Sequence, residues 1–321
     1  MLSRVAESIH WISRYLERAE SVARVVDVNL QLMLDLPLGL ASQWLPLVQI
    51  TGDYPDYESR YNVATQETVT EFLVFDWENP NSIASCLRAA RENARTIREI
   101  ISSEMWEELN DFYLTVQNPT ARDRARETPH EFVRSVRRSS HLLLGVTDST
   151  LSHGEAWHFG RMGRLLERAD KSSRVLDVKY FLLLPDVSDV GTPIDDLHWS
   201  AVLRSVSGFE MYRKRHGQVA PAKIAEFLLL DRDFPRSVHH CLINLSDSLH
   251  AITGTPPGQF RNPAERRLGQ LAAELDYTTM DEVFGQGLHE YLDGLQVKLN
   301  SVGDSIFETF FEHRPLQQGP S

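Results

Sequence analysis

Four charged positions recur along this 321-residue chain at a spacing of 150 residues, and they are the first residues whose types could do chemistry. An arginine presents a planar fork of N–H donors that matches a carboxylate or a phosphate, and a glutamate can accept such bonds or exchange a proton. The set predicts either a pocket for an anionic or amide-bearing group, or buried ion pairs that hold helices together. The recurring pairs are Arg14/Arg164, Glu17/Glu167, Arg18/Arg168 and Arg24/Arg174.

Helical geometry places these charges together on one face. At about 100° per residue, Arg14, Glu17 and Arg18 lie opposite the apolar seam of the helix. A solvent-exposed face would diverge between two copies, yet this one keeps its charges while residues 20–23 (Glu-Ser-Val-Ala) become Asp-Lys-Ser-Ser at 170–173. We therefore favour buried ion pairs over a ligand pocket, and either of these over a solvated face.

A second pattern is a stripe of arginines with no counterpart in the other half of the chain. Its spacing of three, four and three residues puts the guanidinium groups on one side of a helix. The stripe is either a solvated face balanced by nearby glutamates or a docking site for an acidic partner. Its members are Arg88, Arg91, Arg95 and Arg98.

Two Glu-x-x-His motifs, Glu7/His10 and Glu155/His158, have the spacing found in dimetal helical bundles. The two motifs are offset by 148 residues whereas the helix repeats at 150, so they face different directions in the two copies. We therefore prefer ordinary hydrogen bonding and assign no metal ligands. The glutamates that would complete a dimetal set are Glu71 and Glu226.

Cys86 and Cys241 occupy equivalent positions on apolar helix faces, and we predict that both are small buried packing residues rather than nucleophiles. The sequence contains no P-loop, no G-x-G-x-x-G and no G-x-S-x-G motif. No cofactor is predicted, and the chain is a poor candidate to bind a nucleotide by itself.

The charged residues lie in two parts of the sequence that match each other. Residues 14–28 and 164–178 agree at nine of fifteen positions. Residues 71–87 and 226–242 agree at eight of seventeen, at an offset of 155. Tyr57 and Tyr212 match at the same offset. We interpret this as an internal duplication of about 150 residues.

The periodicity is helical nearly throughout. Apolar residues recur at four- and three-residue steps from Ile12 to Leu30, and no convincing alternating strand is present. The sequence predicts an all-α helical bundle packed as one body, with a first helical repeat over 1–150 and a second over 151–321. Further helices are predicted over 59–75, 104–117, 129–151, 263–276 and 281–312.

Composition narrows the classes of protein. The chain is 42% hydrophobic and 24% charged with a net charge of −12, which is typical of a globular protein and weighs against binding nucleic acid or an anionic membrane. Two cysteines cannot build a disulfide framework or a cysteine-based zinc site. The charged N-terminal segment is unlike a signal peptide, and no apolar run is long enough to span a membrane, so we expect a cytoplasmic location.

The Leu-Glu-Arg-Ala elements at 16–19 and 166–169, with Ser-Ser-Glu-Met-Trp-Glu at 102–107, resemble the bacterial alpha-E domain family over essentially the whole chain. That family is named for an all-helical fold and a conserved Glu-Arg motif. The resemblance implies partnership with a circularly permuted ATP-grasp protein, and possible association with a transglutaminase-like protein, in a peptide synthesis or modification system. It carries Glu17, Arg18, Glu167 and Arg168 over as motif residues and not as catalysts.

The leading hypothesis is a non-nucleotide-binding helical partner of an ATP-grasp ligase, which docks the ligase or holds its peptide or amino-acid substrate. The alternative is a stand-alone enzyme with an Arg/Glu pocket, in which Glu17 or Glu167 is the acid or base. A dimetal helical-bundle enzyme is a third and weaker hypothesis.

Overall fold

The computed structural model describes residues 1–36, 44–182 and 192–312. Within these ranges the regular structure consists of helices and contains no strand, which confirms the predicted all-α class. No helix of the described residues is long and apolar enough to cross a membrane.

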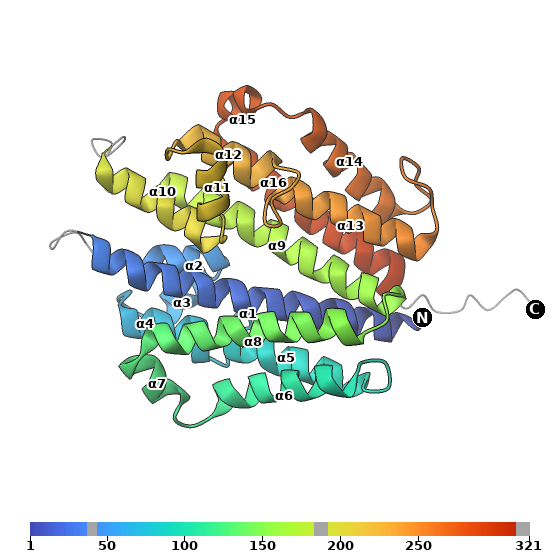
Figure 1. Cartoon of the computed structure of the whole chain (residues 1–321), viewed down its shortest axis with the longest axis horizontal. Coiled ribbons are helices and arrows are strands. Elements are labelled where there is room, and N and C mark those ends of the chain that lie inside the picture. Colours follow the sequence, from blue (N-terminus) through green and yellow to red (C-terminus); the bar gives the residue numbers. More distant parts are fainter. Residues whose placement is uncertain (37–43, 183–191, 313–321) are drawn as a thin grey trace, which may run out of the picture.

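The helices follow one another in two comparable series (Figure 1). The first series is α1 (Ser3–Asp35), α2 (Leu45–Thr51), α3 (Tyr54–Arg60), α4 (Gln66–Thr70), the π-helical turn η1 (Glu71–Phe75), α5 (Ile83–Thr96), α6 (Ser103–Gln117), α7 (Ala121–Glu127) and α8 (Pro129–Thr150). The second is α9 (Glu155–Leu182), α10 (Pro193–Ser205), α11 (Phe209–His216), α12 (Pro221–Leu230), α13 (Val238–Thr253), α14 (Pro263–Tyr277), α15 (Met280–Gln286), α16 (Leu288–Ile306) and the π-helical turn η3 (Phe307–Phe311).

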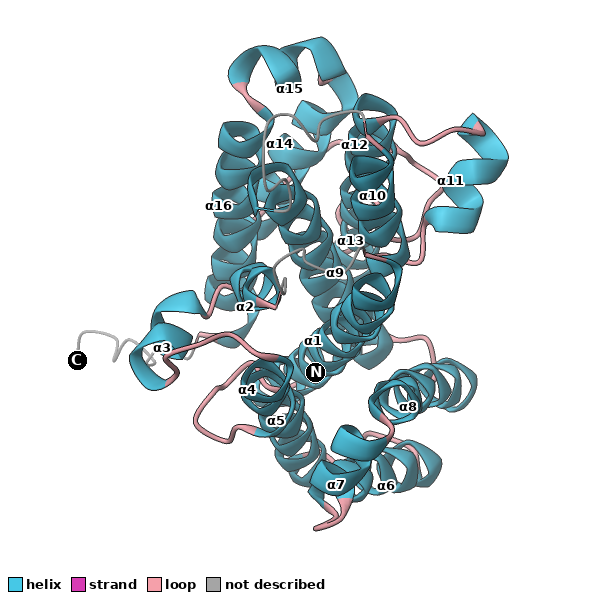
Figure 2. Ribbon diagram, turned by 90° about the vertical axis from the view of Figure 1, so that its left-hand side faces the viewer, coloured by secondary structure: helices cyan, strands magenta, loops and turns pink. Residues whose placement is uncertain are grey.

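The long helices α1 and α9 run side by side through the middle of the molecule. Helices α5 to α8 lie on one side of this pair, and α12 to α16 lie on the other (Figure 2). Close approach of α1 and α9 depends on small residues, because a Cβ on Gly163 would lie 3.0 Å from the carbonyl carbon of His10. On Gly160 it would lie 3.0 Å from the hydroxyl of Ser13.

Helix α1 is covered by other parts of the protein on all sides over much of its length. Every residue from Ala19 to Leu30 is buried, so its polar face is covered as well as its apolar seam. A solvated charged face, the third possibility drawn from the sequence, is therefore wrong for this stretch. Burial requires each charge there to find a partner.

A serine caps the N-terminus of α5 in the first half and the N-terminus of α13 in the second half. The hydroxyl of Ser82 accepts a bond from the amide of Ser85 over 3.1 Å and donates to the carbonyl of Asp76 over 2.6 Å. Ser237, 155 residues later, accepts from the amide of His240 over 3.1 Å and donates to the carbonyl of Asp231. These caps satisfy free amides at the starts of α5 and α13.

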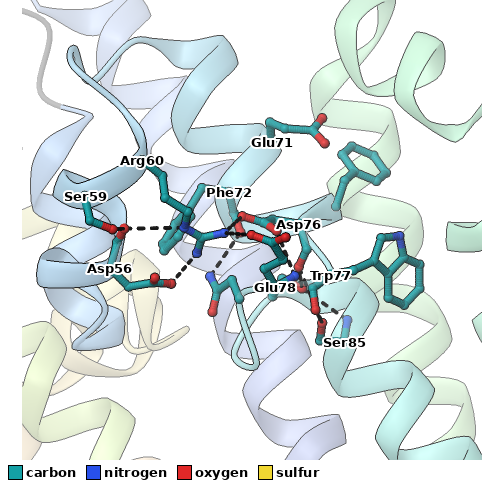
Figure 3. Close-up of polar contacts among 12 residues, drawn as sticks. Asp56, Ser59, Arg60, Glu71, Phe72, Asp76, Trp77, Glu78 and Ser85 are labelled. Carbon is teal, nitrogen blue, oxygen red and sulfur yellow. Dashed lines mark hydrogen bonds and ion pairs between the residues drawn. The ribbon is translucent and has the colours of Figure 1, made fainter.

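The segments that lead into these caps also recur. Arg60 binds Asp76 over 2.6 Å and lies between Asp56 and Asp76 (Figure 3). Its counterpart Arg215 binds Asp231, again at an offset of 155. In both halves an arginine from the α3 or α11 end therefore fixes the turn before the capped helix.

A third recurrence joins the central helices to α8 and α16. Asp27 contacts the Nδ1 atom of His130 at 3.1 Å, and Asp177 contacts that of His289 at 2.6 Å. The two histidines are 159 residues apart, whereas the aspartates are 150 apart. The internal duplication stays our inference from these recurring contacts and from the sequence.

Two predicted helices are divided. The segment 59–75 contains the end of α3, an irregular stretch, and then α4 and η1, because Thr65 caps a new helix by accepting from the amide of Thr68. The segment 281–312 contains α15 and α16, separated at Gly287, whose φ of 102° suits glycine.

Candidate functional site

The two motif glutamates are bound by the arginines of the opposite helix. Nε and Nη2 of Arg168 donate to the two carboxylate oxygens of Glu17, each over 2.7 Å. Nε and Nη2 of Arg18 donate to those of Glu167 over 2.6 and 3.0 Å. Two bidentate ion pairs thus join α1 to α9, and each pairs a glutamate with the other copy's arginine rather than with its own neighbour.

Both glutamates stay ionised. Burial would raise the pKa of Glu17, but Arg168 and Arg236 outweigh burial and lower that pKa to about 2. The same balance of burial against Arg18 and Lys171 leaves the pKa of Glu167 well below its usual range. A carboxylate whose oxygens are already bound by guanidiniums is a poor acid or base at neutral pH, so this geometry does not favour the acid–base role considered for Glu17 or Glu167.

The two ion pairs differ in the residue that binds them from the turn before α5 or α13. Nη1 of Arg18 donates to the amide oxygen of Asn81 over 2.5 Å. The position equivalent to Asn81, 155 residues later, is Arg236. Arg236 donates to Glu17 over 2.8 Å and to Glu20 over 3.0 Å. The first half therefore has the neutral amide of Asn81 at the position where the second half has the guanidinium of Arg236.

This difference changes the role of the arginine one turn before the motif. In α1, Nε of Arg14 donates to Glu167 over 2.9 Å. In α9, the equivalent residue Arg164 has no hydrogen bond or ion pair within the described ranges, and its Nε is buried without a partner. Glu17 accepts instead from Arg168 and Arg236.

Arg164 lines a cavity of about 70 Å³ between α1, α8 and α9. A cavity of that size has room for several water molecules or for the charged end of a larger ligand. The charged groups on its wall are four guanidiniums and two carboxylates, an excess of two positive charges. They are Arg161, Arg164, Arg168, Arg236, Glu17 and Glu20.

The excess of positive charge contributes to lowered pKa values of two arginines of the site. Burial, with Arg168 next in effect, lowers the pKa of Arg164 to about 10. Burial, with Arg236 next in effect, lowers that of Arg24 to about 8, although Arg24 is paired with Glu20. Arg161 binds only neutral groups, the carbonyl of Asn244 and the hydroxyl of Ser248 among them. The cavity is therefore short of negative charge.

The other half has a matching cavity with a different lining. Arg14 lines it in place of Arg164, and Asn300 in place of His141, 159 residues apart. Asp170 and Asp304 also line it, so this cavity does not carry an excess of positive charge. Of these two matching cavities, the one at Arg164 has the excess of positive charge that attracts an anion.

The remaining motif arginines form ion pairs within their own helices. Arg24 pairs with Glu20 and Arg174 with Asp170, one turn earlier in each helix; the second pair is 2.9 Å apart. Such pairs neutralise the buried face of each central helix.

The arginine stripe of α5 lies against aromatic rings of its own half. Three guanidinium carbons are within cation–π distance of a ring centroid, and these contacts pack α5 and the turn after it against α6 and the turn before α5. Arg95 instead pairs with Glu92 over 2.8 Å. The docking role of the stripe stays a prediction. The stacked pairs are Arg88 over Trp77 (4.7 Å), Arg91 over Tyr113 (5.0 Å) and Arg98 over Trp106 (4.8 Å).

The residues considered for a dimetal centre are not brought together. Glu155 pairs with the N-terminal amine, Glu71 with Arg122 and Glu226 with Lys223. Among the described residues, no three His, Cys, Asp or Glu side chains are grouped to hold a metal ion. His10 is buried, and burial lowers its pKa to about 3.

Cys86 and Cys241 are fully buried, as predicted, and burial raises the pKa of each thiol to about 12. A thiol with so high a pKa has almost no thiolate at neutral pH and is a poor nucleophile.

Three residues of the cavity were missed by the motif search: Arg161, Arg236 and His141. Arg236 carried a usable signal, because it replaces Asn81 within the second pair of matching segments. Arg161 and His141 lie outside the matched segments, and only packing brings them to the motif.

Fold and site together define an all-helical protein whose central feature is a pair of buried Glu-Arg motifs. The Alpha-E family model, described as a predicted alpha-helical domain with a conserved ER motif, matches residues 1–311. The chain belongs to the Alpha-E family.

Similar sequences come from mycobacteria. One is a protein of Mycobacterium bovis and two are from strains of Mycobacterium tuberculosis, and all three are described as uncharacterized. Each is 22% identical over 333 residues, covering 95% of this chain and 36% of the relative. The chain thus spans about a third of the length of these relatives. No solved structure matches it.

Proposed function

We propose that this protein is a helical partner of an ATP-grasp ligase and holds the ligase's amino-acid or peptide substrate by an anionic group. In this role the ligase binds the nucleotide, and the Alpha-E chain contributes the cavity at Arg164. The system makes or modifies a peptide or an amino-acid derivative.

One observation carries the proposal: a partly enclosed cavity with four guanidiniums and two carboxylates, one of whose arginines has no partner among the described residues. Burying the Nε–H of Arg164 without an acceptor costs stability, and a ligand that supplies the acceptor would recover that cost. The substrates of ATP-dependent peptide-bond formation carry carboxylates, which suit a bidentate guanidinium.

The partnership itself rests on the family resemblance. In the mycobacterial relatives the matched region is 36% of the protein, so there the Alpha-E region is joined to further chain. Such an arrangement is compatible with a domain that works beside another.

Co-expression tests this proposal. The chain is produced with an ATP-grasp protein encoded beside an Alpha-E gene, purified through a tag on one of them, and assayed for ADP formation with mixed amino acids. We expect a stable complex and faster, amino-acid-dependent ADP formation than with the ligase alone. Absence of a complex, together with an unchanged rate, would refute the proposal.

A matched variant links the assay to the site. Arg164→Met is expected to leave the complex intact and to remove the stimulation. Arg14→Met, the equivalent change in the other half, is expected to retain it, because Arg14 lies outside the cavity.

A further inference from the structure

The cavity at Arg164 has a charged end and an apolar end. Glu17, Glu20 and Arg236 line one end, where α1 and the start of α13 meet. Toward the beginning of α9 the wall is formed by Ile9 and Leu151, with Arg161 beside Trp157. Arg164 lies between these two ends in the order of residues along α9, with Trp157 on the apolar side and Arg168 on the charged side.

Trp157 is fixed in position. Its Nε1 donates to Asp148 over 3.2 Å, and its ring stacks on His153 with centroids 4.3 Å apart. The guanidinium of Arg161 lies 5.4 Å from the ring centroid. A held aromatic ring beside aliphatic side chains makes a preformed apolar subsite.

The charge balance selects among ligands with a carboxylate. A free amino acid is a zwitterion and would leave the excess of two positive charges unchanged. A ligand whose amine is already acylated carries a net negative charge and offsets part of that excess. The two carboxylates of the wall are occupied by guanidiniums, so they are poorly placed to receive an ammonium group.

We infer that the cavity binds an N-acylated apolar amino acid, such as the C-terminal residue of a peptide, with its carboxylate on Arg164 and its side chain between Ile9, Leu151 and Trp157. This deepens the proposed function and rests on it for the link to a ligase. It also fits the asymmetry of the two halves: Glu17 accepts from Arg236, and Arg164 has no hydrogen bond among the described residues.

Calorimetric titration of the whole chain tests this inference with defined probes. N-acetyl-L-leucine is expected to bind at least about tenfold more tightly than N-acetyl-L-leucinamide, which lacks the carboxylate. L-leucine, acetate and inorganic phosphate, which lack the net charge or the apolar group, are expected to bind at least about tenfold more weakly than N-acetyl-L-leucine.

Two variants locate the binding. Arg164→Met is expected to weaken N-acetyl-L-leucine binding at least about tenfold, whereas Arg14→Met changes it less than about twofold. A thermal melt of each variant shows that it is folded. Equal affinity for the amide, unchanged binding by Arg164→Met, or no binding of N-acetyl-L-leucine at millimolar concentration would each overturn the inference.

A readout at His141 separates ligand contact from a structural effect. Burial and the nearby Arg24, Arg236 and Arg137 lower the pKa of His141, while Glu17 acts in the opposite direction and Glu20 lies 3.5 Å from its Nε2. An anion in the cavity offsets the positive charge, so N-acetyl-L-leucine should raise the pKa of His141 in an NMR titration. An unchanged or lower pKa in the presence of the probe would contradict binding at this cavity.

The ligase experiment and the probe experiment test different claims, and either claim can be wrong without the other. If the complex forms and stimulates ADP formation but N-acetyl-L-leucine does not bind, the substrate class is wrong and the partnership stands. If the probe binds as expected but no complex forms and the rate is unchanged, the ligand class stands and the partnership is wrong.

Discussion

Arg14 and Arg164 occupy equivalent positions in α1 and α9, yet Arg14 donates to Glu167 over 2.9 Å while Nε of Arg164 is buried without a partner among the described residues. The two halves also differ at one position in the turn before α5 and α13. Arg236 donates to Glu17, whereas its neutral counterpart Asn81 accepts from Arg18 and leaves Glu167 to Arg14 and Arg18. This difference, together with the different linings of the two cavities, separates an arginine in an ion cluster from one that lines a cavity without a hydrogen bond among the described residues.

The crossed ion pairs should dominate the stability of the α1–α9 contact. Glu17→Ala strands the buried Arg168 and removes an acceptor of Arg236, so we expect a loss on the order of 3–5 kcal/mol in the free energy of unfolding. Glu167→Ala should cost a similar amount. Urea unfolding measures both.

The control for that experiment is Glu92→Ala, which removes a half-exposed partner of Arg95. It should change the free energy of unfolding by less than about 0.5 kcal/mol. If Glu17→Ala is as mild as this control, the crossed pairs do not hold the helices.

Acid should weaken the protein through the same glutamates. Because Arg168 and Arg236 lower the pKa of Glu17 in the folded state from 4.5 to about 2, its contribution to stability is complete above the unfolded pKa. It is lost as the pH falls from about 4.5 toward 2. Urea unfolding at pH 7 and pH 3 should therefore show a smaller pH-dependent loss for the double variant Glu17→Gln/Glu167→Gln than for the wild type. Equal losses would show that other groups cause the acid sensitivity.

The approach of the two central helices depends on Gly163. Its Cα lies against the carbonyl group of His10, so the methyl group of Gly163→Ala must push α1 and α9 apart, at a cost of about 1–3 kcal/mol. Gly145→Ala in α8 meets no atom within 4 Å and should stabilise the protein by about 0.5–1 kcal/mol through helix propensity. Chemical denaturation compares them, and a Gly163→Ala protein as stable as Gly145→Ala would contradict the tight contact.

Much of the fold follows from local patterns in the sequence. The helical periods of 129–151 and 104–117 predict α8 and α6 closely, because long amphipathic segments leave little choice of structure. The division at Gly287 was missed because the apolar period continues across it. The break before Thr65 was missed because a hydroxyl cap is a weak signal inside a longer pattern.

The site was only half predictable. Recurrence singled out Glu17, Arg18 and their copies, and helical geometry put them on one face. Helical geometry could not show that α1 is covered on all sides. It also could not show that these charges pair between the two halves. The contact of Arg236 with Glu17 joins residues 219 positions apart in the sequence, which no local pattern could show.

The most direct test of the account compares Arg164→Met with Arg14→Met in unfolding free energy. Methionine keeps the aliphatic stem and removes the charge. The account predicts that Arg14→Met loses about 1–3 kcal/mol, because Glu167 loses a donor. Arg164→Met should change stability by less than about 0.5 kcal/mol or increase it, because it removes a guanidinium that has no ion-pair partner among the described residues and whose Nε is buried without an acceptor. A loss for Arg164→Met as large as that for Arg14→Met would show that Arg164 is part of the scaffold and contradict its role in holding a ligand.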